Sequence, residues 1–267
     1  MYNISKNIII VKGILLMRDS RIAKMEQYIT QNSTASIAEL CEVFDVSLNT
    51  VRRDIRILMD KGIIEKVHGG VRTTLYDELI PFPVRNVANI TQKISIAQKA
   101  AELVADGDII FIDTGTTTLQ MISALKDKYI TVITNNLQFI IQALPYENIS
   151  IISLPGKLSR KNNSFYGFNQ AQFMEYFNVK TCFMATAGIS LDRGITHPSV
   201  SEGQFCEYVI EHSDHTVLLA DHTKFDVVSL FTYAKLEMLD VIITDLMPSQ
   251  EYQKSFKANN IQLTTTG

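Results

Sequence analysis

Residues 46–58 hold the densest set of side chains able to do chemistry in this chain: one Asn and three Arg. These four recur at spacings of three and four, which places them on one face of a predicted helix: Asn49, Arg52, Arg53 and Arg56. The apolar residues share the opposite face: Leu48, Val51, Ile55 and Leu58. Arg pairs bidentately with guanine and Asn with adenine in the major groove, and both bind phosphate. For an isolated helix a solvated basic face is the simpler interpretation, so the flanking residues have to decide.

Those flanks predict a helix-turn-helix. Ser36 and Glu39 have the spacing of a capping box, which starts a first short helix that runs to Phe44. Residues 45–46 form a tight turn, and Ser47 then stands at the N-cap of the basic helix. Two short helices joined by a minimal turn are typical of a helix-turn-helix, whose second helix contacts DNA.

A β-hairpin is predicted directly after the basic helix. Lys61-Gly62 is a helix-ending signal, and residues 63–67 have the composition of a strand. His68-Gly69-Gly70 then predicts the hairpin tip, and residues 71–73 the returning strand. Two helices followed by such a hairpin make a winged helix-turn-helix.

The whole module, from Val46 through the hairpin tip, resembles the signature of the DeoR family of bacterial transcriptional regulators. Lys66 stands where the family usually has Arg, which keeps the charge but loses the bidentate geometry. Pattern and resemblance together give the predicted DNA-contacting residues: Ser36, Ser47, Asn49, Thr50, Arg52, Arg53, Arg56, Lys66, His68, Gly69 and Arg72.

Composition sets the limits for the rest of the chain. At 267 residues, of which 46% are hydrophobic, the chain can bury a sizeable core and hold two domains. A net charge of −3 and a pI near 6.0 give no global nucleic-acid signature, so DNA binding must come from a local patch. Three widely spaced Cys residues without a CxxC pair favour reduced thiols in a cytoplasmic protein over a zinc site or disulfides. We expect no metal, no cofactor and no catalytic residue.

The domain boundaries follow from changes in pattern. Residues 1–16 match nothing downstream: they are either an extra segment before a true start at Met17, which we favour, or a real N-terminal arm. No apolar run approaches the ~20 residues of a membrane helix, so no membrane partner is expected. We predict a winged helix-turn-helix domain over 17–74 and a linker over 75–90, where Pro81 and Pro83 break helix and Phe82 docks. An effector-binding α/β domain follows over 91–267.

The α/β assignment depends on an alternation of short apolar runs with helical stretches. Strands are predicted at 109–112, 130–133, 149–153, 181–185, 216–220 and 241–244, and helices at 94–105, 117–125 and 137–144. Uninterrupted apolar runs are typical of strands buried on both faces, which indicates a mainly parallel sheet.

In such sheets, ligands bind beyond the carboxyl ends of the strands. The first strand ends in Asp113-Thr114-Gly115-Thr116-Thr117, where hydroxyls and free N–H groups at a helix start suit an anion. Ordinary capping explains the same loop about as well. Asn136 and Lys224 follow other strands, and Lys224 could instead be a surface residue.

Taken in order, the strand ends resemble the effector domain of the DeoR family, which is ribose-5-phosphate isomerase-like and binds sugar phosphates. The resemblance implies that the Gly-Thr-Thr loop holds a phosphate and that Lys224 lines the same pocket. The implied effector-binding residues are Asp113, Thr114, Gly115, Thr116, Thr117, Asn136, Gly156, Gly188, Glu202 and Lys224. Pro155 replaces a Gly, and Cys206 stands where Lys is common, which leaves the ligand's identity open.

The leading hypothesis is therefore a DNA-binding repressor of carbohydrate-metabolism genes, controlled by a phosphorylated sugar. The expected partners are double-stranded operator DNA, that effector and, because palindromic sites require it, a second copy in a dimer or tetramer. The alternative is a sugar-phosphate isomerase fused to a DNA-binding module, with Asp113, Glu202 or Asp221 as the general base. A general nucleic-acid module conflicts with the acidic net charge.

Overall fold

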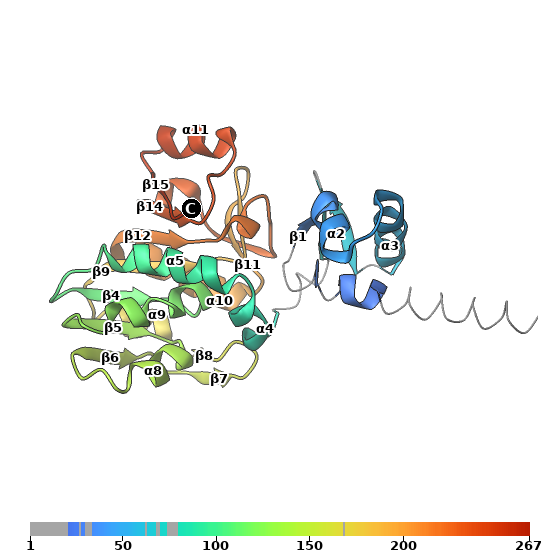
Figure 1. The fold of residues 1–267 in the computed structure, drawn as a ribbon. Helices are drawn as coiled ribbons and strands as arrows, with labels where there is room; N and C mark the ends of the chain where they lie inside the picture. Colours follow the sequence, from blue (N-terminus) through green and yellow to red (C-terminus); the bar gives the residue numbers. More distant parts are fainter. Residues whose placement is uncertain are drawn as a thin grey trace, which may run out of the picture. The chain divides into compact units, whose positions relative to one another are not determined.

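The computed structural model describes residues 21–26, 28–29, 34–61, 63–67, 70–73, 80–167 and 169–267. The chain divides into two compact units, Met1–Leu75 and Tyr76–Gly267 (Figure 1). The expectations for residues 1–20, and for His68 and Gly69, lie outside the described residues. No helix in the described part of the chain is long and apolar enough to cross a membrane.

The first unit contains the predicted helix-turn-helix and its wing. Residues 21–26 and 28–29 are helical, and α2 (Ile37–Phe44) and α3 (Leu48–Asp60) follow. A small antiparallel sheet completes the unit, in the order β1 (Thr34–Ser36), β3 (Gly70–Thr73) and β2 (Ile64–Val67). The sequence analysis did not predict β1, which adds a third strand to the wing.

The helix starts follow the predicted caps. The Ser36 hydroxyl accepts from the Glu39 N–H at 3.1 Å, and the Glu39 carboxylate accepts from the Ser36 N–H at 3.2 Å, which confirms the capping box. Ser47 caps α3 through the Thr50 N–H. The expectation for Leu48 was wrong, because this residue is 44% exposed. As the first residue of α3 it precedes the buried stripe, which begins at Val51.

A buried ion pair fixes the back of α3. Asp54 is fully buried, and both its carboxylate oxygens accept from Arg21 of the first helix, at 2.7 and 3.2 Å. This hydrogen bond raises the pKa of Arg21. The pair joins the first helix to α3 beside the apolar contacts of Val51, Ile55 and Leu58, so two kinds of interaction hold α3 in place.

The second unit is built on a seven-stranded sheet (Figure 1). In spatial order the strands are β15 (Gln262–Thr265), β14 (Val241–Thr244), β12 (Ser213–Leu219), β9 (Val179–Ala185), β4 (Ile109–Ile112), β5 (Ile130–Thr134) and β6 (Ile149–Ser153). Every neighbouring pair is parallel, which confirms the α/β prediction.

Both faces of this sheet are buried, which explains the continuous apolar runs. Along β9, Cys182 and Met184 belong to one core cluster, and Phe183 between them belongs to the other. Successive side chains on a strand point to opposite faces, so a central strand needs apolar residues at every position. Val217 and Leu218 of β12 divide between the two clusters in the same way.

Helices cover the two faces, and their bounds correct three expectations. They are α4 (Phe82–Val87), α5 (Ile90–Ala101), α6 (Thr116–Leu119), α7 (Ile122–Leu125), α8 (Leu137–Ala143), α9 (Gln170–Met174), α10 (Val200–Glu211) and α11 (Gln250–Ala258). Pro83 lies in the first turn of α4 and does not break it, because the backbone N–H groups of a first turn have no partner within the helix. The helix expected over 94–105 starts and ends earlier, as α5. The helix expected over 117–125 is divided in two, where Gln120 and Met121 donate to carbonyls only three residues back.

Several short strands that were not predicted lie at the end of the sheet where the strands lead into the helices. They form a hairpin of β7 (Lys157–Ser159) and β8 (Ser164–Tyr166), and a sheet of β10 (Gly188–Ser190), β11 (Gly194–His197) and β13 (Phe231–Ala234). Two 3-10 turns complete the unit: η2 (His222–Lys224) and η3 (Leu236–Met238). Phe82 is 3% exposed and packs in the core, which confirms its predicted docking.

Candidate functional site

The outer face of α3 presents the predicted DNA-reading side chains to solvent. All four are exposed, on the side away from the buried stripe: Asn49, Arg52, Arg53 and Arg56. Val51 and Leu58 on the opposite side are fully buried. The face therefore carries three guanidinium groups and one amide that no described residue of this unit buries, as a major-groove reader requires.

The other predicted DNA contacts are held in different ways. Thr50 is half-buried, and its hydroxyl lies 3.0 Å from that of Ser47. In the wing Lys66 is exposed, whereas the guanidinium of Arg72 pairs with Glu65 on the opposite strand. Of the two basic wing residues described, Lys66 is thus the one that has no ion pair within this unit.

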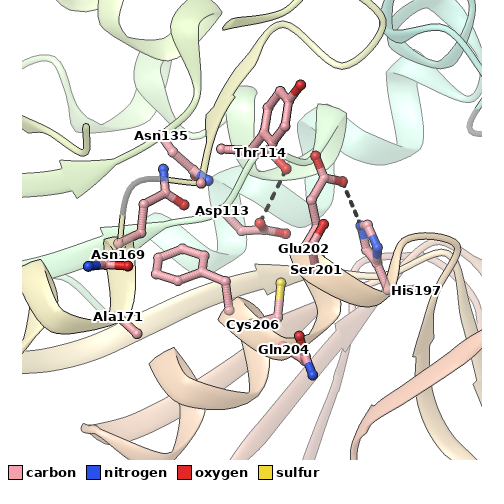
Figure 2. Close-up of a pocket in the computed structure, with 14 residues that line it drawn as sticks. Asp113, Thr114, Asn135, Asn169, Ala171, His197, Ser201, Glu202, Gln204 and Cys206 are labelled. Carbon is pink, nitrogen blue, oxygen red and sulfur yellow. Dashed lines mark hydrogen bonds and ion pairs between the residues drawn. The ribbon is translucent and has the colours of Figure 1, made fainter. Parts of the chain in front are cut away.

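The second unit contains a cavity of about 250 Å³ at the carboxyl ends of β4 and β5 (Figure 2). Its lining residues come from strand ends, from the loop around Gly167 and from α10: Asp113, Thr114, Asn135, Tyr166, Gly167, Asn169, Gln170, Ala171, His197, Ser201, Glu202, Gln204, Phe205 and Cys206. One part of the wall is therefore aromatic or apolar, and the other bears carboxyl and amide groups.

Two carboxyl groups, the buried Asp113 and the half-buried Glu202, dominate the electrostatics of the cavity. Asp113 accepts from the Ala185 N–H at 3.1 Å, and Glu202 lies 3.5 Å from Nε2 of His197 (Figure 2). Burial raises the pKa of Asp113 and of Glu202, and it lowers the pKa of His197. Burial therefore works against charge on all three groups, and hydroxyl groups are suitable partners for them.

Arg85 of α4 connects this cavity to the segment that enters the second unit. Its guanidinium donates to the side-chain oxygen of Asn162 and to the Ile80 carbonyl, the latter at 2.9 Å. The Asn162 amide in turn lies 3.4 Å from both Glu202 carboxylate oxygens. Burial lowers the pKa of Arg85 to about 10, so the group remains a cation at neutral pH.

Cationic side chains gather beside Arg85. Lys93 of α5 is 4% exposed, and its ammonium donates to the Arg85 carbonyl at 2.5 Å. Burial, together with the positive charges of Lys224 and Arg85, lowers the pKa of Lys93 to about 7. Asp221 opposes them: burial raises its pKa, but Lys224, Thr223 and Lys93 together hold it below the ordinary value.

The Gly-Thr-Thr loop turns tightly between β4 and α6. A Cβ on Gly115 would lie 2.1 Å from the Cβ of Ala185, so the close approach of β9 requires glycine there. The Thr118 hydroxyl donates to the loop carbonyls of Asp113 and Gly115, at 2.8 and 2.9 Å. Gln120 ties the loop to α4 by donating to Asn86 at 3.2 Å. The loop and the cationic side chains thus belong to neighbouring elements.

Comparison with known proteins identifies both units. The DeoR-like helix-turn-helix domain matches residues 21–74, and the DeoR C terminal sensor domain matches residues 88–246. The HTH-type transcriptional regulator IolR of Bacillus subtilis (strain 168) is 38% identical over 88% of this chain and 94% of its own length. The chain belongs to the DeoR family of transcriptional regulators.

Two further comparisons extend the range of similarity to this DeoR-family chain. The glycerol-3-phosphate regulon repressor of Escherichia coli (strain K12) is 28% identical over 89% of this chain and 94% of its own length. A ribose 5-phosphate isomerase A from Methanocaldococcus jannaschii aligns with 51% of this chain and 55% of its own, at 19% identity and a TM-score of 0.38. The curated relatives are named as regulators, which favours the regulator hypothesis over the enzyme alternative.

The predicted effector residues of this DeoR-family sensor unit divide into three groups. Asp113, Thr114 and Glu202 line the cavity. Gly115, Thr116 and Thr117 form the loop beside it, and Lys224 lies with Lys93 and Asp221. The remaining three have other contacts within the chain: Asn136, Gly156 and Gly188. A Cβ on Gly156 or on Gly188 would lie within 2.7 Å of the backbone of Tyr166 or Val227, so each glycine permits a close packing contact.

Four cavity residues are absent from the predicted set: Asn135, Tyr166, His197 and Phe205. The polar pair at the end of β5 was the available signal, but it did not tell which Asn faces the cavity. Asp245, which follows β14, accepts from the His222 N–H at 2.6 Å, which holds η2.

Proposed function

We propose that this chain is a repressor of carbohydrate-metabolism genes that binds operator DNA through α3 and its wing, and is released by a phosphorylated sugar. The DNA part is supported by the exposed Asn–Arg face of α3. The effector part is supported by a cavity whose carboxyl groups can accept hydrogen bonds from hydroxyl groups, and by a cluster of cationic side chains beside it.

The buried ammonium group of Lys93 is the observation that carries the effector assignment. A lysine that is 4% exposed, next to two further cations, costs free energy unless negative charge balances it. Asp221 supplies one carboxylate to this cluster. A phosphate dianion would supply the rest of the compensation, so the cluster of Lys93, Lys224 and Arg85 fits a phosphorylated ligand better than a neutral one.

The polar loop gives the same ligand a second set of donors. The N-cap residue of α6 is Gly115, which has no side chain to cap the first backbone N–H groups. Such N–H groups at a helix start favour anions. The cavity beside the loop then has Asp113 and Glu202 for hydroxyl groups. We therefore infer a ligand with a phosphate at one end and a polyhydroxy part at the other.

The test is release of operator DNA by phosphorylated and free sugars. Fluorescence anisotropy of labelled operator, with glucose 6-phosphate, fructose 6-phosphate and the corresponding free sugars, should show release by a phosphosugar alone. Lys224→Gln should weaken ligand binding by at least about tenfold, because one charged hydrogen bond is lost, while operator affinity stays unchanged.

The matched control is Lys99→Gln, on the same helix as Lys93. Lys99 pairs with Glu102 at the surface, so its loss removes one positive charge without touching the cluster. An effector without any anionic group, or normal induction of the Lys224 variant, would contradict the proposed site.

We further propose that the protein acts in the cytoplasm as a homo-oligomer. A palindromic operator requires two recognition helices related by a two-fold axis. Sedimentation velocity on the free protein and on its operator complex would measure the number of chains. A single chain bound to a full operator would contradict this proposal.

A further inference from the structure

Asn135, which lines the cavity, has a buried side-chain oxygen that accepts no hydrogen bond from any described residue. The residue follows β5, is 6% exposed and lines the cavity. Its Nδ2 donates to the Phe165 carbonyl at 3.2 Å, which fixes the orientation of the amide. The other end, Oδ1, is buried and has no partner among the residues that the structure describes.

The neighbouring Asn136 differs in its side-chain oxygen, which has partners. Its Oδ1 accepts from the Gln138 and Phe139 N–H groups, both at 3.1 Å, and so caps α8. Its Nδ2 donates to the Asp113 carbonyl at 3.3 Å. The Oδ1 atom of Asn136 is therefore occupied by contacts within the fold, whereas that of Asn135 is not. Of the two residues, Asn135 is the candidate for ligand binding.

The polar wall around Asn135 is rich in acceptors. Asp113 and Glu202 contribute carboxyl groups to it. Gln170 contributes no spare donor, because its Nε2 already donates to the Pro155 and Phe165 carbonyls at 2.8 and 3.0 Å. A ligand that satisfies this wall must bring hydrogen-bond donors of its own, and the aromatic rings of Tyr166 and Phe205 suit the C–H face of a sugar.

We propose that Asn135 is a specificity-determining residue, whose Oδ1 accepts a hydrogen bond from one hydroxyl group of the effector. This inference rests on the proposed function and names the chemistry of the ligand's uncharged part. A buried acceptor left without a donor costs free energy, so the cavity selects a ligand with a hydroxyl at that position over the deoxy analogue.

The experiment measures a coupling between one atom of the protein and one atom of the ligand. Calorimetry on the full chain would use the tighter binder of glucose 6-phosphate and fructose 6-phosphate, together with its series of mono-deoxy analogues. In the natural protein, the deoxy analogue that lacks the hydroxyl bound by Asn135 should bind about tenfold more weakly than the parent. In Asn135→Ala the parent should bind about tenfold more weakly, and the deoxy penalty should disappear.

Ser164→Ala is the matched control. The Ser164 hydroxyl is also buried without a partner among the described residues, but it does not line the cavity, so its removal should leave the deoxy penalty intact. Equal affinity of the natural protein for every deoxy analogue would overturn the inference without any variant. A penalty that survives in Asn135→Ala would overturn it as well.

These outcomes are distinguishable from failure of the proposed function. If no phosphosugar binds the natural protein, the effector assignment itself is wrong. If a phosphosugar binds and depends on Lys224 but is indifferent to Asn135, the assignment stands and only the inference about Asn135 fails.

Discussion

At the scale of single residues, the buried Lys93 has the most unusual environment. Its ammonium contacts the Arg85 carbonyl, and its pKa lies near 7 because burial disfavours the charged form. In the unfolded chain the same lysine has its ordinary pKa of 10.5. Between these two values the folded protein binds fewer protons than the unfolded chain, so this group makes the protein more stable as the pH rises.

We therefore expect binding of a phosphosugar to be linked to proton uptake. At pH 8 the free protein holds Lys93 largely neutral, and a phosphate dianion beside it would favour the ammonium form. Affinity should then fall as the pH rises above about 7, while the phosphate itself is already dianionic. Calorimetry in buffers of different ionisation enthalpy measures the uptake.

Lys93→Gln should abolish this proton uptake, whereas Lys99→Gln on the exposed side of α5 should leave it unchanged. Binding without proton uptake at pH 8 in the natural protein would show that Lys93 does not face the phosphate.

Predictability at the residue scale depended on whether a role follows from spacing. The capping box of Ser36 and Glu39 follows from a local pattern, and it was predicted correctly. The exchange of roles between Asn135 and Asn136 does not, because it depends on which amide meets the helix start of α8 and which meets the cavity. The pairing of Arg21 with Asp54 joins residues 33 positions apart and was equally invisible.

At the scale of elements, α3 is the part of the molecule whose substitutions should separate binding from folding. Arg52→Ala and Arg53→Ala should each leave the fold intact, because both side chains are exposed. A lost base contact should cost roughly 1–3 kcal/mol and relax specificity at one position, whereas a lost phosphate contact should weaken all sequences alike.

Gel-shift titrations against operator and scrambled DNA would distinguish the two cases. Lys24→Ala is the control, since Lys24 is an exposed cation on the helix before α2 and lies outside the α3 face. Unchanged operator affinity in both arginine variants would show that α3 is not the recognition helix.

The ion pair behind α3 should have the opposite effect, on stability. Arg21→Met leaves the Asp54 carboxylate buried and unpaired, and should lower the free energy of unfolding by about 3–5 kcal/mol. The double variant Arg21→Met, Asp54→Leu should recover most of that loss, because no charge remains buried. Urea unfolding followed by circular dichroism measures both. Equal stability of the two variants would mean that the pair contributes through packing alone.

The elements themselves differed in how well the sequence predicted them. β4, β6 and β14 were predicted to the residue, and β4 and β14 show why: an inner parallel strand is a short apolar run. The strands of the β10–β11–β13 sheet have three or four residues each and mixed burial, so no periodicity marks them. Since these elements frame the cavity, the site was predicted less completely than the sheet.

At the scale of the whole molecule, a DNA-binding unit and a sensor unit share one chain. If a phosphosugar lowers operator affinity by some factor, thermodynamic linkage requires that operator lower phosphosugar affinity by the same factor. We expect calorimetry with and without saturating operator to give this factor, and anisotropy with and without saturating ligand to match it. A ligand affinity that ignores operator would contradict control by two coupled states.

The position of Cys206 in the cavity wall controls how readily its thiol reacts. Burial raises the pKa of the Cys206 thiol well above its ordinary value, and this residue lines the cavity. Only a thiolate reacts readily with an alkylating reagent, so Cys206 reacts when its wall opens to solvent. Its labelling rate therefore reports how often the cavity opens. Burial raises the pKa of Cys182 to about 11, and the labelling rate of this residue serves as a reference within the sheet. A ligand bound against α10 should slow the labelling of Cys206 and leave that of Cys182 unchanged.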